Sequence, residues 1–488
     1  MHTRRDQVQA HLFTLSRVTA GLIRAEPDAA ETPMRRFTLG TVMGLAVGVL
    51  VLGGLVGFGF ISPGITNSFK KQGTIVVEKE TGTRYVFLDG ALHPVLNHAS
   101  AVLISGRPPG RSRGGLLGGQ NTVQTVSSKS LKQVPKGPPI GIVGAPDSLP
   151  DPKQLDRSAW AVCTTTSKQA DGSDIKRVTA YLGGSVRGLT ELGDQRTMLV
   201  KGDDGTYLAW LDRKLKLGGP AALVGLGYSN VRSFPVADAW LNALPSGADL
   251  RAVAVPGRGG AGIPLGGQAT RVGQLFRTAG GESYLMMPDG LAPLTETEAA
   301  LVLADPATQA AYPGGQVLPL DIGTAAVAAA PRSNRTRASG LPTVLPQAVD
   351  NTGTGDRVPC FKVTPGKGPG GTAAIRVASR PAGPEDGTAA PGVPRAPGAA
   401  GALTADRVVI APGSGMLVRE EAPAGDAAPR LYLITDVGQK FPLATPDVAK
   451  KLGYDDTKAA PLPASVLALV PSGPVLDEAA AKTPLAAN

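Results

Sequence analysis

A long uncharged run near the N-terminus is the feature that most constrains this chain. From Phe37 to Ser62 the sequence reads FTLGTVMGLAVGVLVLGGLVGFGFIS, and the first charged residue after Arg36 is Lys70. About 20 apolar residues let a helix span the hydrocarbon core of a bilayer. The run is too long, and lies too far from the N-terminus, for an ordinary signal peptide. No second run of this kind occurs, so we predict a single-pass membrane protein with one transmembrane helix over residues 37–62.

Basic residues flank this run on one side. Because basic flanking residues stay in the cytoplasm, they set the predicted topology: a cytoplasmic N-terminus and a large extracytoplasmic region, in a protein of the cell membrane. The topology-setting residues are Arg4, Arg5, Arg17, Arg24, Arg35 and Arg36.

Glycines recur at a spacing of four within the predicted span. Small residues at that spacing line one helix face and let a second helix approach closely, which favours helix packing within a membrane assembly. The alternative is that glycine is simply common in membrane spans. The glycines concerned are Gly40, Gly44, Gly48, Gly53 and Gly57.

The cytoplasmic segment, residues 1–36, has the pattern of an amphipathic helix over residues 3–25, with Thr3 as N-cap and Pro27 beyond its end. Its apolar stripe has no core of its own to pack into. The stripe could lie on the inner leaflet, dock to a partner protein, or merely lead into the span, and a docking surface is favoured. The apolar stripe comprises Val8, Leu12, Leu15, Thr19 and Leu22.

A strand, a turn, a second strand and a capped helix recur four times at uneven intervals. The copies begin GTRYVFLDG, GTYLAWLDR, GESYLMMPDG and PRLYLITDVG. Asp-Gly supplies the positive φ values of tight hairpins, and Asn97, Thr295 and Thr445 are suitable helix N-caps. The second copy lacks a turn glycine. Each copy is too small to bury its own face, so we expect the copies to pack on one another or on the central region, with the fourth copy folded back beside the first. The predicted turn residues are Asp89, Gly90, Asp289, Gly290, Asp436 and Gly438.

The fold class that follows is a short cytoplasmic amphipathic helix, one transmembrane helix and a large elongated α+β extracytoplasmic region. That region has a central β-rich domain and four small strand-turn-helix quasi-repeats. Gly (64) and Pro (43) favour short strands and many turns over long helices. The predicted division is 1–36 cytoplasmic, 37–62 transmembrane, 63–81 lead-in, 82–106 repeat 1, 107–204 central domain, 205–228 repeat 2, 229–280 central region, 281–306 repeat 3, 307–364 return strand of the central domain, 365–405 Pro/Gly/Ala-rich linker, 406–475 repeat 4 region and 476–488 tail.

Only two cysteines occur, Cys163 and Cys360, and both lie on the predicted outer side. In an oxidising compartment such a pair favours a disulfide. The alternative is two free thiols.

The search for chemistry is mostly negative. All four histidines lie at or before residue 98, so a Ser-His-Asp or Cys-His arrangement in the outer region is nearly excluded, and no Cys/His cluster could hold zinc. No GxxxxGK[ST] loop occurs. Residues 257–262 match GxGxxG, but the prolines and glycines that follow argue against the helix that would receive a phosphate. The net charge of +10 is dispersed, so we expect no nucleic-acid partner. We predict no catalytic, cofactor-binding or metal-binding residue.

Three stretches carry a family resemblance. RDQVQAHLFTLSRVTAGLIRAEPDAAETPMRR followed at once by the span, KGPPIGIVGAPDSLP, and WAVC ending at Cys163 resemble the EccB component of actinobacterial type VII (ESX) secretion systems. The four recurring copies resemble that family's quasi-repeats, and the resemblance covers nearly the whole chain.

The resemblance implies a core subunit that assembles with an EccC-type motor ATPase, EccD and EccE in the inner membrane. It implies outer regions that associate with each other, a disulfide between the two cysteines, and repeats like those of cell-wall-binding modules. It implies export of small helical proteins with a Trp-X-Gly turn. Members of the family are often described as ATPases, which makes ATP the one cofactor suggested, by the resemblance alone.

The leading hypothesis is therefore a structural subunit of a secretion machine. The alternatives are an extracytoplasmic ATPase or cell-wall-acting enzyme of the same system, and a wall-binding anchor without a role in secretion. The missing phosphate loop and the absence of histidine beyond residue 98 favour the structural subunit.

Overall fold

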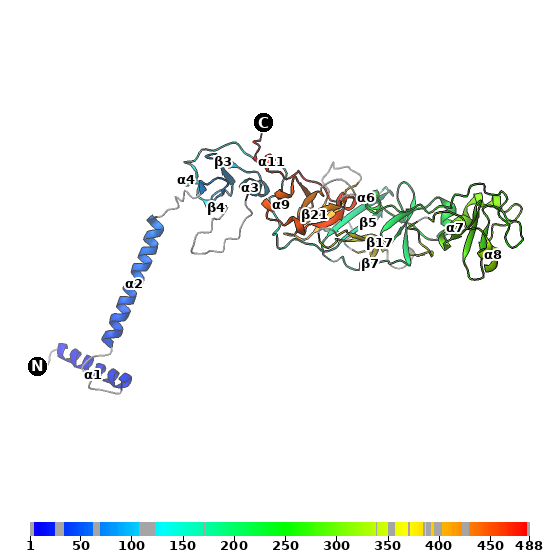
Figure 1. Cartoon of the computed structure of the whole chain (residues 1–488). Helices are drawn as coiled ribbons and strands as arrows, with labels where there is room; N and C mark the ends of the chain where they lie inside the picture. Colours follow the sequence, from blue (N-terminus) through cyan, green and yellow to red (C-terminus); the bar gives the residue numbers. More distant parts are fainter. Residues whose placement is uncertain are drawn as a thin grey trace. The chain divides into compact units, whose positions relative to one another are not determined.

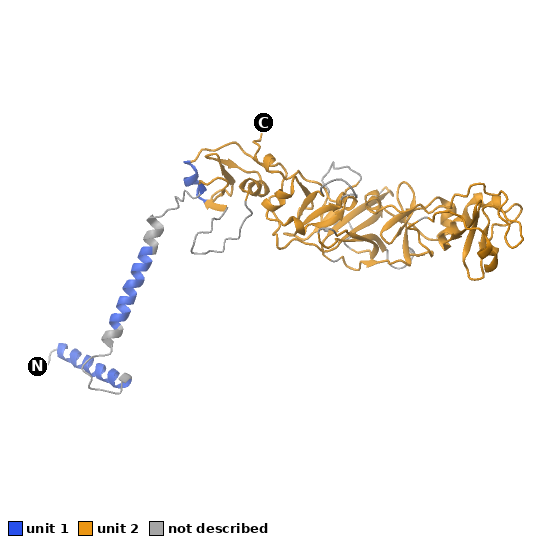
Figure 2. Cartoon of the chain, viewed as in Figure 1, with its two compact units in different colours: residues 1–69, 126–133 blue, residues 70–125, 134–488 orange. Residues whose placement is uncertain are grey.

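The computed structural model describes residues 4–24, 34–61, 69–106, 123–168, 171–184, 186–337, 339–349, 357–368, 371–383, 386, 392–394, 403–421 and 429–485. Two compact units divide the chain (Figure 2). One unit comprises residues 1–69 and 126–133, and the other comprises residues 70–125 and 134–488.

The first compact unit is helical: α1 (Arg4–Arg24), α2 (Met34–Ile61) and the short α4 (Ser128–Leu131) (Figure 1). Helix α1 confirms the predicted N-terminal helix, although the proposed cap, Thr3, lies outside the described residues. Val8, Leu12, Leu15 and Leu22 of the predicted stripe are between 52% and 81% exposed. Helix α2 covers nearly all of the predicted run. Within the described part of the chain, no helix has both the length and the hydropathy needed to cross a membrane.

A seven-stranded sheet lies at the centre of the second compact unit. Its strand order is β19-β20-β6-β5-β17-β18-β7, and β5 and β17 are formed by the β-like runs WAVCTTTSK and RVPCFKVT. The strands are β5 (Trp160–Lys168), β6 (Asp174–Leu182), β7 (Thr190–Glu191), β17 (Arg357–Thr364), β18 (Ala374–Pro381), β19 (Val393–Pro394) and β20 (Arg407–Ile410).

The linker predicted over residues 365–405 is wrong for 374–381. These residues form β18, which pairs antiparallel with β17 over eight residue pairs, from Arg357↔Pro381 to Thr364↔Ala374. Ile375, Val377 and Ala378 are buried. The Pro- and Gly-rich composition on both sides of this strand hides a short hydrophobic stretch that the sheet needs.

The second compact unit also contains four small sheets. We call each of these sheets, with its helices, a module. In each sheet three consecutive strands run antiparallel with the first strand inside, and a fourth strand lies beside the first: β3-β2-β1-β4, β10-β9-β8-β11, β14-β13-β12-β15 and β23-β22-β21-β24. Where the register is given, the fourth strand runs parallel to the first.

The modules have the following elements. Module 1 has β1 (Ile75–Glu78), β2 (Arg84–Leu88), β3 (Ala91–Pro94), α3 (His98–Ser105) and β4 (Val123–Val126); module 2 has β8 (Arg196–Lys201), β9 (Thr206–Trp210), β10 (Arg213–Lys216), α5 (Pro220–Gly225), β11 (Phe234–Pro235) and α6 (Asp238–Ala243), with β16 (Gln347–Ala348) paired to β8. Module 3 has β12 (Leu275–Arg277), β13 (Ser283–Met287), β14 (Gly290–Leu294), α7 (Glu296–Ala304), η2 (Pro306–Ala311), β15 (Leu320–Asp321) and α8 (Thr324–Ala329). Module 4 has β21 (Gly415–Glu421), β22 (Leu431–Thr435), β23 (Lys440–Leu443), α9 (Pro446–Lys451), η4 (Asp456–Lys458), β24 (Ala460–Pro463) and α10 (Ala464–Leu467).

The first three sheets extend further than the predicted repeats, whereas the fourth sheet lies within the predicted region 406–475. The lead-in over residues 63–81 supplies β1, and β8 and β12 likewise precede the hairpins predicted as repeats 2 and 3. A hairpin and a helix cannot close a sheet alone, because the apolar face of two strands is too small. The strands before and after them complete it.

In every module a three-residue segment, which we call the return segment, pairs with the third strand. Its first residue is a proline, and the carbonyl of that proline accepts a hydrogen bond at 2.8–2.9 Å from a backbone N–H in the third strand. Two residues later an N–H of the segment donates back to the same strand residue, at 2.8–3.0 Å. The segments are PKG at 135–137, PSG at 245–247, PRS at 331–333 and PSG at 471–473, which bind Leu92, Lys214, Leu291 and Lys440.

The third residue of each return segment is matched to the side chain it faces. A Cβ on Gly137 would lie 2.2 Å from the His93 ring, and one on Gly473 would lie 2.3 Å from the Phe441 ring. Module 3 has a small side chain in the equivalent strand position, Ala292, and there the return segment carries Ser333. The close approach of the segment therefore decides where glycine is needed.

The modules pack in pairs. One core cluster combines α3 of module 1 with β22 and α9 of module 4, and another combines α5 of module 2 with Leu301 of α7 in module 3. Modules 2 and 4 both join the core of the central sheet, through residues such as Trp240 and Val466. The expectation that the fourth copy lies beside the first is confirmed.

The tail also takes part in this packing. Helix α11 (Glu478–Lys482) contacts α3, and Ala481 is fully buried. The N–H of Leu485 donates to the carbonyl of Pro139 at 3.0 Å. The segment predicted only as a tail, residues 476–488, is therefore part of the fold as far as Leu485.

Candidate functional site

The predicted hairpin turns occupy different positions in the four modules. In module 1, Asp89 (φ 48°) and Gly90 (φ 82°) form the two-residue turn between Leu88 and Ala91. In module 4, Asp436 lies in the turn and Gly438 (φ 71°) donates its N–H to the carbonyl of Thr435 at 3.0 Å.

The prediction is wrong for Gly290. Met287 pairs with Gly290, so the turn residues are Pro288 and Asp289, and Gly290 is the first residue of β14. Proline fits the first position of such a turn because its φ is already fixed. Glycine is required at 290 because a Cβ there would lie 2.2 Å from the carbonyl oxygen of Pro331, in the return segment.

Module 2 makes its turn without glycine. Trp210 pairs with Arg213, which leaves Leu211 and Asp212 in the turn, and Leu211 has a φ of 52°. Positive φ is uncommon for a bulky residue. The carbonyl of Leu211 accepts a hydrogen bond from Val377 of the central sheet, which holds this conformation.

Helix caps occupy the predicted positions. The Asn97 side chain accepts from the N–H of Ser100 at 3.0 Å. Thr295 and Glu298 form a complete capping box, and Glu298 is also paired with Arg335. Thr445 is the N-cap of α9 with Pro446 at the first helical position, without a side-chain bond.

The two cysteines lie on adjacent strands of the central sheet. Cys163 of β5 and Cys360 of β17 are direct register partners with a Cα–Cα distance of 4.1 Å, and they form a disulfide. Both are buried, in a small cluster with Val358 and Ala378. The structure therefore has the disulfide and not the two free thiols.

The glycines of α2 face open space. A Cβ added to Gly40, Gly44, Gly48 or Gly53 would meet nothing within 4 Å. The Arg17 guanidinium lies 5.9 Å from the Phe13 ring centroid within α1, and Arg4 and Arg5 are exposed. For Arg24, Arg35, Arg36 and Gly57 the structure describes the helical backbone alone.

Two buried lysines were not anticipated. Lys214 and Lys440 occupy equivalent third-strand positions in modules 2 and 4, and each is only 9% exposed. The Lys214 Nζ donates to the carbonyl of Leu241 at 2.9 Å, and the Lys440 Nζ donates to that of Val470 at 2.8 Å. Burial lowers both pKa values, that of Lys440 to about 8. Modules 1 and 3 have leucines here, so only comparison of the return segments would have found these positions.

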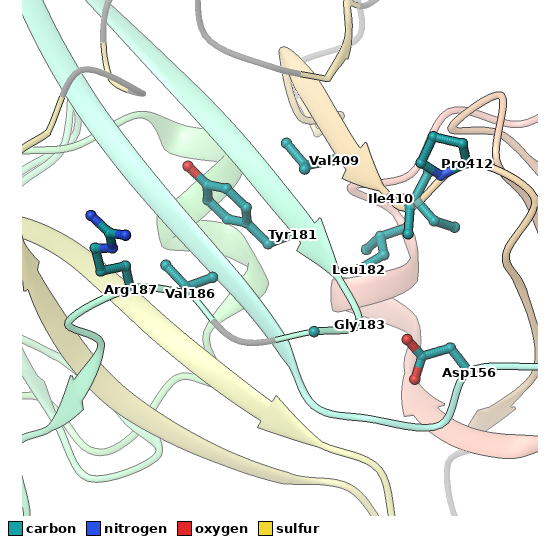
Figure 3. A pocket seen from close by; sticks show the side chains of 11 residues that line it. Asp156, Tyr181, Leu182, Gly183, Val186, Arg187, Val409, Ile410 and Pro412 are labelled. Atoms are coloured by element: carbon teal, nitrogen blue, oxygen red, sulfur yellow. The ribbon is translucent and has the colours of Figure 1, made fainter.

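A cleft of about 510 Å³ lies beside the central sheet (Figure 3). Tyr181 and Val409, which are register partners, line it together with Arg187 and Asp156. The Asp156 Oδ1 is occupied by the N–H and hydroxyl of Ser158. Among the described residues that line it, the cleft offers an aromatic ring, a cation and a carboxylate, but no histidine, cysteine, serine or threonine.

The glycine-rich loop and the scattered metal-ligating residues are the remaining candidates for a site. No cluster of three or more metal-ligating side chains occurs among the residues that the structure describes. The glycine-rich loop at 257–262 pairs with its neighbour through the N–H of Gly259 and the carbonyl of Val272, and strand β12 follows it. The two histidines of module 1 have separate surroundings. The His93 Nδ1 lies 3.0 Å from the carbonyl oxygen of Pro138. The pKa of His98 is lowered, first by burial and then by the nearby Arg84.

Comparison with known proteins identifies the family. The model described as "Type VII secretion system ESX-1, transport TM domain B", that of EccB, matches residues 1–486. The chain belongs to the EccB family. The ESX-5 secretion system ATPase EccB5 of Mycobacterium tuberculosis is 28% identical, over 97% of this chain and 92% of that protein. The ESX-3 secretion system ATPase EccB3 of the same organism is 27% identical, over 97% and 88%.

Solved structures agree with this assignment. A chain of an intact ESX-5 inner membrane complex matches 100% of this EccB-family chain and 96% of its own length, with 25% identity and a TM-score of 0.67. The EccB3 dimer from the ESX-3 core complex has the same fold, with 24% identity, a TM-score of 0.62, and coverage of 84% and 99%.

Proposed function

We propose that this EccB-family chain is a structural core subunit of a type VII secretion membrane complex. The observation that carries the proposal is its likeness, over the whole chain, to a subunit of the intact ESX-5 inner membrane complex. In this role the chain is anchored in the inner membrane, associates with itself outside it, and supports export of small helical proteins with a WXG motif.

The topology proposed is single-pass. The uncharged run of α2 is the anchor, the preceding arginines keep α1 in the cytoplasm, and the region from residue 70 onward lies outside. The Cys163–Cys360 disulfide supports this placement, because disulfides persist in oxidising compartments.

The four modules serve as assembly units in this proposal. They share one strand order, and we interpret them as quasi-repeats of one ancestral unit arranged around the central domain. The proline-led return segments, which recur in all four, support that interpretation. The residues predicted as repeats are the hairpin and helix of each module.

The partners proposed are an EccC-type motor ATPase, EccD, EccE and further copies of this chain, with the cell wall as a possible contact of the modules. The exposed stripe of α1 is the proposed docking surface for the membrane components. One valine and three leucines of the stripe on α1 are more than half exposed. Exposed apolar side chains gathered on one helix favour a partner that covers them.

The test is co-purification of the full-length chain from membranes, with a stripe variant, Leu15→Glu, and a matched control, Gln9→Glu, on another side of α1. We expect the wild type and the control to retain EccC, EccD and EccE, and the stripe variant to lose them at unchanged expression. Purification of the wild-type chain without any of these components contradicts the proposal.

The second candidate is an extracytoplasmic enzyme, because the relatives EccB5 and EccB3 carry the name ATPase. Hydrolysis of ATP by the purified region 70–488 separates the two functions. Saturable turnover that a single substitution in this region abolishes would favour the enzyme. Turnover that stays at the background level of buffer supports the structural subunit.

A further inference from the structure

Module 3 exposes a surface whose equivalents in modules 2 and 4 are buried. We call modules 2 and 4 the inner modules. We propose that the face formed by β15 and α8 is a self-association surface, and that it takes the same face of a second copy of this chain. The inference rests on the self-association proposed above and names the residues that would provide it.

Equivalent elements in modules 2 and 4 show what this face does inside the chain. Their fourth strands and second helices pack into the core of the central sheet: Phe234 is 2% exposed, and Trp240 and Leu462 are fully buried. The inner modules therefore use their fourth-strand side for burial.

The same elements of module 3 are open on their outer side, while Ile322, Val327 and Ala330 pack against the core of module 3 itself. Leu318 and Leu320, at the edge strand, are 56% and 39% exposed. No residue of α8 is buried. Strand β15 is the last strand of its sheet, so its outer edge is free for a partner in the part of the chain that the structure describes.

The composition of this face is unusual for exposed chain. Residues 315–330 read GQVLPLDIGTAAVAAA, with Asp321 as the single charged residue. Helix α8 itself has alanines, a valine and one threonine. An apolar surface of this kind in an otherwise ordinary exterior marks an interaction site.

Charge favours a second copy as the partner. A symmetric interface brings identical residues together, so any net charge on it repels itself. The single carboxylate here, Asp321, is the register partner of Arg277 in the same sheet, so the face is close to neutral. The small alanine side chains also allow two helices to approach closely.

The internal packing provides a template for such a contact. Second helices α6 and α10 of the inner modules lie against each other, and the Ser465 hydroxyl donates to the carbonyl of Ala243 at 3.0 Å. Two copies of module 3 paired through α8 would repeat, between chains, a contact that two modules already make within one chain.

Cysteine crosslinking of the full-length chain tests this directly. Both native cysteines are in the disulfide, so Ala328→Cys in α8 introduces the only reactive thiol. The matched control is Arg332→Cys, an exposed residue at the opposite edge of the same sheet. With a short bismaleimide in the membrane complex, we expect a dimer band for Ala328→Cys and none for the control.

A charge-swap experiment identifies the partner. Ala328→Asp and Ala328→Lys, each expressed alone, are expected to lower dimer recovery roughly tenfold or more, because like charges then meet. Co-expression of the two variants, with different tags, is expected to restore a mixed pair. Failure of the mixture to recover, or a crosslink to another protein, overturns the proposal.

The result is distinguishable from failure of the proposed function. If EccC, EccD and EccE co-purify while Ala328→Cys gives no dimer band, the subunit assignment stands and the module 3 surface is refuted.

Discussion

Removal of the buried Lys440 amine should change how the stability of module 4 depends on pH. Lys440 has a pKa of about 8 in the folded chain, because burial disfavours its charged form, against 10.5 for a free side chain. Between these values the unfolded chain binds a proton that the folded chain does not. Stability therefore rises as pH rises from about 8 to 10.5, and this contribution is absent at neutral pH.

The magnitude follows from the two pKa values. Each unit of difference between them corresponds to about 1.4 kcal/mol, so the full effect is at most about 3 kcal/mol. At pH 9.5 the free energy of unfolding is higher by about 2 kcal/mol than it is below the folded-state pKa. Lys440→Met keeps the length of the side chain and removes the titration.

The assay is urea unfolding of the purified outer region at pH 7.5 and 9.5, followed by tryptophan fluorescence. Trp160 is a suitable reporter because its indole N–H donates to the Met416 sulfur of module 4 at 3.1 Å. We expect the wild type to gain about 2 kcal/mol relative to Lys440→Met over this pH range. Lys153→Met, at an exposed site, should behave as the wild type does. Equal pH dependence in wild type and Lys440→Met refutes the reasoning.

Two further predictions concern the sheets. Replacing both Cys163 and Cys360 by alanine should lower the free energy of unfolding by up to about 5 kcal/mol, because the disulfide closes a loop with a sequence separation of 197; urea midpoints of oxidised wild type and the double variant measure this, and coincident midpoints would contradict it. Gly473→Ala should cost about 1–3 kcal/mol through contact with the Phe441 ring. Ser333→Ala removes the hydroxyl that accepts from the N–H of Arg335 at 3.2 Å, and should cost less, at most about 1 kcal/mol. Equal thermal midpoints for these two variants would show that the return segments tolerate a side chain.

Sequence reasoning succeeded where a local signal is strong. The patterns WAVCTTTSK and RVPCFKVT mark β5 and β17, and the polar residue before each helix marks Asn97 and Thr295 as caps. These features depend on neighbouring residues alone, so a single sequence carries them.

It failed where the partner is remote. Strand β18 owes its place to β17 and β7, and the residues on both sides of it have the composition of a loop. Gly290 was assigned to a turn because Asp-Gly is a turn signal, yet the Pro331 carbonyl, distant in sequence, is what requires it. The surface of module 3 is likewise visible only once modules 2 and 4 show the buried equivalent.

The pairing of modules sets an order for biogenesis. Modules 2 and 3 are consecutive, so they can join as soon as about 150 residues of that stretch have been synthesised, a size typical of one domain. Module 1 precedes both of them in the sequence, yet its core is completed by module 4 and by α11, whose Ala481 is buried. Modules 1 and 4 can therefore join only after modules 2 and 3 have been synthesised. Until module 4 and α11 follow, the apolar face of α3 remains uncovered, and a nascent chain of this kind depends on late elements to cover its first module.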